Sequence, residues 1–138
     1  MWIGTNSSAG AGTGDTALYA ISFNLPSTVL SGSLNLYYTV DNVLGLSNLG
    51  IYINGTALPN STALLCSLCS TSFTQENLYT DSSIGPLLVS GTNWLYLDGV
   101  NQGAAAGLIF SANFTFTSAS SSATGSTVLP AFPSHRSP

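Results

Sequence analysis

Charged side chains are nearly absent from this sequence of 138 residues. One Arg, no Lys and five carboxylates make up 4% of the chain and give a formal net charge of -4. A surface with almost no cations cannot neutralise phosphate groups, which argues against nucleic acid and against anionic membrane surfaces as partners. The polarity of the surface must therefore come from Ser, Thr and Asn.

Long apolar runs are also missing. No stretch approaches the roughly 18 to 20 continuous apolar residues of a membrane span, so none is predicted. Residues 1–4, MWIG, contain neither the basic nor the apolar region of a signal peptide, so none is predicted in the given chain. We therefore expect the chain to start inside a longer protein. A composition poor in Lys and Glu but rich in Ser, Thr, Gly and Asn is typical of secreted or cell-surface proteins. We therefore expect an exported protein.

Cysteine is limited to Cys66 and Cys69. A structural zinc usually needs four nitrogen or sulfur ligands, and only His135 could be added to this pair. A thioredoxin-like redox motif requires a βαβ context, which does not precede the pair. In an oxidising compartment the interpretation favoured is a disulfide that closes a small surface loop.

Groups for catalysis are equally scarce. The single histidine, His135, lies in the tail, so a Ser-His-Asp enzyme is not expected. A glycosidase needs two carboxyl groups facing each other across a cleft. The carboxylates stand singly, mostly beside turn residues: Asp15, Asp41, Glu76, Asp81 and Asp98. We interpret Asp15, Asp41 and Asp81 as turn formers and predict that the protein is not an enzyme.

The sequence does contain short segments in which apolar and polar residues alternate, as in strands with one buried face. Pro26 ends the first of them, and Asn54-Gly55 is a strong signal for a type I′ hairpin turn. Strands are predicted at residues 16–24, 33–40, 49–53 and 56–58, with further short ones at 71–74 and 78–80. No segment shows helical spacing.

Residues 90–117 contain the two clearest strands and are predicted to form one hairpin. Leu95 and Leu97 share the apolar face of its first arm. The turn residues expected between the arms are Gly99, Asn101, Gln102 and Gly103. The second arm has an apolar face made of Leu108, Phe110, Ala112, Phe114 and Phe116. The fold predicted is all-β, a single antiparallel β-sandwich of jelly-roll topology over residues 16–117. Residues 1–15 are expected to be a lead-in loop or a remnant strand, and 118–138 a Ser/Thr-rich linker and disordered tail.

Several motifs resemble a known family. TVDN (39–42), IYINGT (51–56), SGTNWLYLDGVN (90–101) and AGLIFSANFTFT (106–117) are similar to the galactose-binding-like β-sandwich domain of bacterial exported proteins of the PEP-CTERM class. The opening WIGTNSSAGAGTGDTALYAISFNLP also resembles the entry of that domain. The resemblance implies an exported jelly-roll domain followed by a linker and a sorting tail. Here VLPA (128–131) stands where the sorting motif would begin, and no apolar span follows.

Carbohydrate binding is the functional hypothesis favoured, because sugars stack on exposed aromatic rings while polar side chains bind their hydroxyls. If Leu95 and Leu97 point inward, Trp94, Tyr96 and Asp98 point outward. Tyr37 and Tyr52 are expected at similar outward positions on other strands. Alternatively, Trp94 covers a sheet edge, packs on the loop at 59–83 or lies in a contact between protomers.

Two other possibilities follow from the same residues. Asp41, Asn42 and Asp98 are candidates for a structural calcium site, because jelly-roll domains often bind calcium through Asp, Asn and backbone oxygens. No other cofactor is predicted. The alternative to glycan binding is a structural subunit of an extracellular matrix or filament, whose uncharged surface suits self-association through exposed strand edges.

Overall fold

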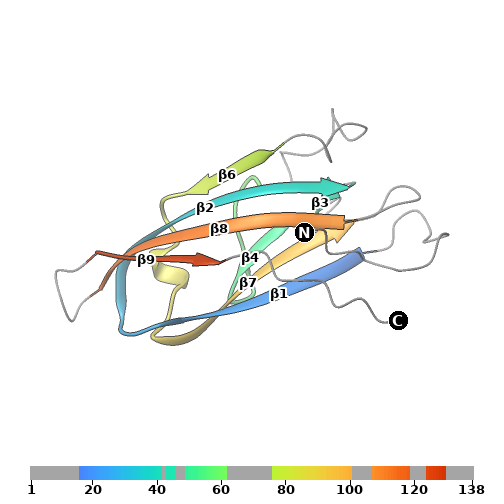
Figure 1. Cartoon of the computed structure of the whole chain (residues 1–138). Helices are drawn as coiled ribbons and strands as arrows, with labels where there is room; N and C mark the ends of the chain where they lie inside the picture. Colours follow the sequence, from blue (N-terminus) through green and yellow to red (C-terminus); the bar gives the residue numbers. More distant parts are fainter. Residues whose placement is uncertain are drawn as a thin grey trace, which may run out of the picture.

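Two antiparallel sheets form the protein, and their apolar faces pack against each other (Figure 1). The computed structural model describes residues 16–41, 43–45, 49–61, 76–100, 107–118 and 124–129. Its elements in chain order are β1 (Thr16–Leu25), β2 (Val29–Asp41), β3 (Val43–Leu44), β4 (Ile51–Ile53), β5 (Thr56–Ala57), β6 (Asn77–Asp81), the 3-10 helix η2 (Gly85–Leu87), β7 (Gly91–Val100), β8 (Gly107–Ser118) and β9 (Thr124–Leu129). The predicted all-β antiparallel sandwich is confirmed.

The first sheet has the order β1-β7-β4-β5, with β3 also paired to β7, and the second has the order β6-β2-β8-β9. In Figure 1 the layer with β2 and β8 lies above the layer with β1 and β7. Pro26 follows the last residue of β1, and the chain then enters the opposite sheet as β2. Proline suits this corner because it has no N–H to offer a sheet ladder.

The core lies between the layers and is built from the predicted apolar faces. On β8, every second residue from Leu108 to Phe116 is buried, as the alternation indicates. Phe23 of β1 and Phe114 of β8 stack across the core, with ring centroids 4.3 Å apart and planes inclined by 24°. Because these strands belong to different sheets, the aromatic pair ties the two layers together.

The predicted hairpin at 90–117 is wrong. Both arms are strands, but β7 pairs with β1, β3 and β4, whereas β8 pairs with β2 and β9 in the other sheet. Gly99, predicted as part of the turn, is buried inside β7 and lies opposite Ala17. Two strands with matching apolar faces can be neighbours within one sheet or face each other across a sandwich core. Alternation alone does not distinguish these arrangements.

The Asn54-Gly55 turn between β4 and β5 is confirmed, since both residues have positive φ, 49° and 84°. The short strand predicted at 78–80 is confirmed as β6. The composition of residues 118–127 predicts a linker, whereas β8 extends to Ser118 and β9 pairs with it from Thr124 onward. The strand expected at 71–74, the lead-in 1–15 and the tail after 129 lie outside the described residues.

Candidate functional site

A groove on the outer face of the first sheet brings together most of the predicted binding residues. Strand alternation buries Leu95 and Leu97 and turns Trp94, Tyr96 and Asp98 of β7 away from the core. The groove has a volume of about 560 Å³. Its lining consists of Leu18, Tyr52, Asn54, Gly55, Tyr96 and Asp98.

Three adjacent strands contribute to this groove because of their register. Tyr52 of β4 lies directly opposite Tyr96 of β7, and Leu18 of β1 lies opposite Asp98. Side chains opposite each other on one face of an antiparallel pair are close neighbours. The two tyrosines are therefore neighbours on the outer face of β4 and β7, and the Asp98 carboxylate lies two residues further along β7.

Trp94 extends this aromatic surface along β7. Its ring and that of Tyr96 are nearly parallel, with centroids 6.2 Å apart and planes inclined by 19°. Trp94 is 41% exposed, an unusual fraction for so large an apolar side chain. The ring pair is thus available to a ligand from the solvent side.

The turn after β4 is tied to β7 at this position by the Asn54 side chain. Its Oδ1 accepts a hydrogen bond from the Trp94 backbone N–H at 2.8 Å. The backbone N–H of Asn54 in turn donates to the Trp94 carbonyl at 2.9 Å. The Asn54 amide nitrogen also donates to the Leu87 carbonyl and to Asn93 Oδ1, both at 2.8 Å. These bonds fix the backbone of Trp94, and with it the place from which the indole projects.

Asn93 supports the same arrangement from inside. It is fully buried, and its amide nitrogen donates to the carbonyls of Val89 and Gly91 at 2.7 and 3.0 Å. Its Oδ1 accepts two hydrogen bonds, from the Val89 N–H at 2.9 Å and from the side-chain amide nitrogen of Asn54 at 2.8 Å. A buried amide with all these bonds made is a rigid anchor for the start of β7.

Asp98 gives the groove its negative charge. Partial burial raises the pKa of its carboxyl group, because the charged form loses hydration. No ion pair of Asp98 occurs within the described part of the chain, since Arg136 and His135, the only Arg and His, lie beyond it. The carboxylate therefore faces the groove without a compensating cation from the described residues.

Tyr37, the remaining candidate binding residue, points outward as predicted but does not lie near the other candidates. Tyr37 is 39% exposed, but it belongs to β2 and so projects from the outer face of the second sheet. The alternation along the strand predicts that Tyr37 points outward. It does not predict which of the two sheets contains the strand. Leu18, Asn54 and Gly55 were not predicted as site residues. Leu18 carried a usable signal, because it is a large apolar residue on the polar side of its strand and is 60% exposed.

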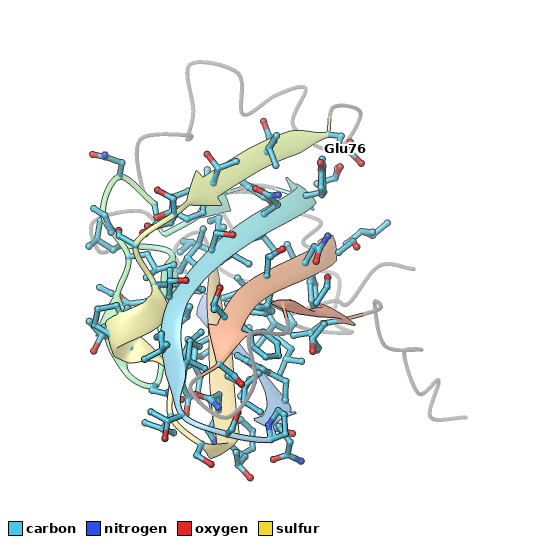
Figure 2. All side chains as sticks on the ribbon, turned by 90° about the vertical axis from the view of Figure 1, so that its left-hand side faces the viewer. Glu76 is labelled. Carbon is cyan, nitrogen blue, oxygen red and sulfur yellow. The ribbon has the colours of Figure 1, made fainter. Side chains whose placement is uncertain are left out.

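The described carboxylates are distributed over both sheets. Glu76, labelled in Figure 2, lies just before β6 in the second sheet, whereas Asp98 lies on the outer face of the first. Asp81 ends β6 and accepts hydrogen bonds at Oδ1 from the N–H and hydroxyl of Ser83, at 2.8 and 2.6 Å. These bonds fit its predicted role in a turn.

Two predicted sites cannot be placed completely. The calcium site rests on Asp41, whose side chain is outside the described part, and on Asn42, which is outside it altogether, so calcium stays a prediction. Cys66 and Cys69 also lie outside the described residues.

No family model matches this chain. No curated protein matches it either. Among solved structures, it is similar to the crystal structure of Streptomyces avermitilis alpha-L-rhamnosidase complexed with L-rhamnose, with a TM-score of 0.52 at 15% sequence identity. The match covers 92% of this chain but 11% of the rhamnosidase chain. At this identity the similarity shows the fold, and it agrees with a β-sandwich.

The likeness to a small part of a large enzyme chain shows that such a sandwich occurs within longer proteins. Within the part of the chain that the structure describes, no helix is long and apolar enough to cross a membrane. What the described site offers to a ligand is an open aromatic surface with one carboxylate at its border. Those groups can stack and form hydrogen bonds.

Proposed function

We propose that the protein is a non-catalytic, exported or cell-surface module that binds glycans in the groove on the outer face of the first sheet. The observation that carries the proposal is the exposed pair of nearly parallel rings, Trp94 and Tyr96, continued across the sheet by Tyr52. The C–H faces of a pyranose ring pack well on such surfaces, because both are flat and apolar. Asp98 supplies a carboxylate at the border of the groove, while Asn54 holds the backbone of Trp94 in place.

The chemistry of the surroundings agrees with this proposal. A glycan is rich in hydroxyl groups and needs few charges for recognition, and the chain provides few. The similarity to part of a rhamnosidase is compatible with a module that accompanies carbohydrate chemistry. The groove is open to solvent, which suits part of a long polymer better than complete burial of a small molecule.

The test compares Trp94→Ala with Tyr37→Ala in binding to a panel of polysaccharides, measured by affinity electrophoresis and then by calorimetry. Both variants remove a partly exposed aromatic ring, one stacked on Tyr96 beside the groove and one on the opposite face of the sandwich. We expect Trp94→Ala to weaken binding at least about tenfold, because aromatic anchors carry much of the binding energy at such sites. Tyr37→Ala should bind like the unchanged protein.

Two outcomes would contradict the proposal. If no polysaccharide binds the unchanged protein, the groove is not a glycan site under these conditions. If Trp94→Ala and Tyr37→Ala weaken binding equally, the site lies elsewhere. The elution volume of each sample, recorded alongside, tests the alternative of a structural subunit, for which large assemblies are expected.

A further inference from the structure

The groove contains a negative charge that the described residues leave unbalanced. Asp98 lies on the outer face of β7, between β1 and β4. Its cross-strand neighbours are Leu18 of β1, Gly50 just before β4 and Gly45 after β3, and Tyr52 lines the same groove. None of these residues carries a positive charge. Its own backbone is occupied, since the Asp98 N–H donates to the Gly50 carbonyl at 2.9 Å and its carbonyl accepts from Gly45 at 2.7 Å. Only the carboxylate is left to meet a ligand.

The neighbours of this carboxylate also attract cations. Tyr96 and Tyr52 line the same groove, and the faces of aromatic rings interact favourably with ammonium groups. The whole chain adds to this effect with its net charge of -4 and its single Arg. Such a field raises the local concentration of cationic ligands and lowers that of anionic ones.

We infer that, among glycans, the groove prefers those with protonated amino groups, which would pair with Asp98 while the sugar rings stack on Tyr96 and Trp94. The inference rests on the proposed function and specifies the class of glycan. A partly buried ion pair combined with a cation–π contact is the physical basis of the preference. Glycans with carboxylate or sulfate groups are expected to be excluded from the same site.

The experiment uses three β-1,4-linked hexasaccharides, of glucosamine, N-acetylglucosamine and glucose, titrated calorimetrically at pH 6 and low salt. They share one linkage and differ at carbon 2. We expect the glucosamine hexamer to bind about tenfold more tightly than either neutral hexamer. The preference should decrease as salt is added, because salt screens a partly exposed ion pair.

Asp98→Asn is the decisive variant, and Asp81→Asn is its matched control. Both remove one negative charge, but Asp81 ends β6 in the second sheet, away from the groove. Asp98→Asn should bring the ratio of affinities for the aminated and neutral hexamers to about one. Asp81→Asn should keep the preference. Thermal unfolding of both variants confirms that each is folded.

The outcomes separate this inference from the proposed function. Equal binding of all three hexamers, or a preference that Asp98→Asn leaves intact, overturns the inference while glycan binding stands. A preference lost equally in Asp81→Asn shows that only overall charge matters and also overturns it. If none of the hexamers binds but another polysaccharide does in a Trp94-dependent way, the amine preference is wrong. If no glycan of any kind binds, both proposals fail.

Discussion

At the scale of single residues, two buried tyrosines of the second sheet differ in what their hydroxyl groups meet. Tyr38 of β2 is 2% exposed, and its hydroxyl has no hydrogen-bond partner among the described residues. The Tyr79 hydroxyl of β6 donates to the Pro59 carbonyl at 2.8 Å. Burying a hydroxyl without a partner costs free energy, whereas a bonded one contributes to stability.

Replacement of each tyrosine by phenylalanine should therefore have opposite effects. Tyr38→Phe is expected to raise the free energy of unfolding by about 1 kcal/mol, because it removes an unpaired buried polar group. Tyr79→Phe is expected to lower it by about 1 kcal/mol, because the Pro59 carbonyl loses its donor. Urea unfolding at pH 7 measures both. Equal destabilisation by the two variants would mean that Tyr38 has a partner after all.

At the scale of elements, the helix η2 packs on β2 through two glycines. A Cβ atom added at Gly85 would lie 2.9 Å from the backbone nitrogen of Gly32 and 2.9 Å from Cα of Ser31. Both nearest atoms belong to the backbone of β2, which cannot move aside as a flexible side chain could. The close approach of η2 to the strand therefore depends on the missing side chain.

Gly85→Ala should push η2 away from β2 and lower the free energy of unfolding by roughly 1 to 3 kcal/mol, as for other overpacked positions. Ser90→Ala is the matched control, since Ser90 is exposed in the loop that follows. It should change stability by less than about 0.5 kcal/mol. A Gly85→Ala variant as stable as this control would show that η2 can shift at little cost.

The strands also show where a sequence pattern stops being informative. The alternation in β7 and β8 correctly predicts their buried faces, but their assignment to one hairpin is wrong. The pattern records which side chains avoid water and contains nothing about the strand to which each backbone bonds. Similarly, the Gly, Ser and Thr residues of β9 read as a linker, although β9 pairs with β8 and buries Leu129.

At the scale of the whole molecule, the response to pH is expected on the alkaline side. Burial raises the pKa of Tyr38 to about 12, and burial together with the nearby Asp81 raises that of Tyr79 to about 12. In the unfolded chain these phenols lose their protons near pH 10. Between pH 10 and 12 the folded state thus binds more protons than the unfolded state, and stability falls as pH rises.

The measurement is the free energy of unfolding in urea at pH 9, 10 and 11. We expect little change up to about pH 9.5 and a decrease above it, because the unfolded phenols titrate below the folded pKa of about 12. The double variant Tyr38→Phe, Tyr79→Phe should show a smaller decrease over the same range. An identical decrease in the double variant would assign the alkaline sensitivity to other groups.

By itself, the sequence determined that this is a β protein with few charges, which residues of its long strands are buried, and that Asn54 and Gly55 form a tight turn. These properties are local, since they depend on alternation along one strand or on the backbone preferences of two residues. Only the tertiary structure decided which strands are neighbours. Pairing joins residues far apart in the chain, such as Tyr52 with Tyr96 and Leu18 with Asp98, and so creates the groove, while it places Tyr37 on the opposite face.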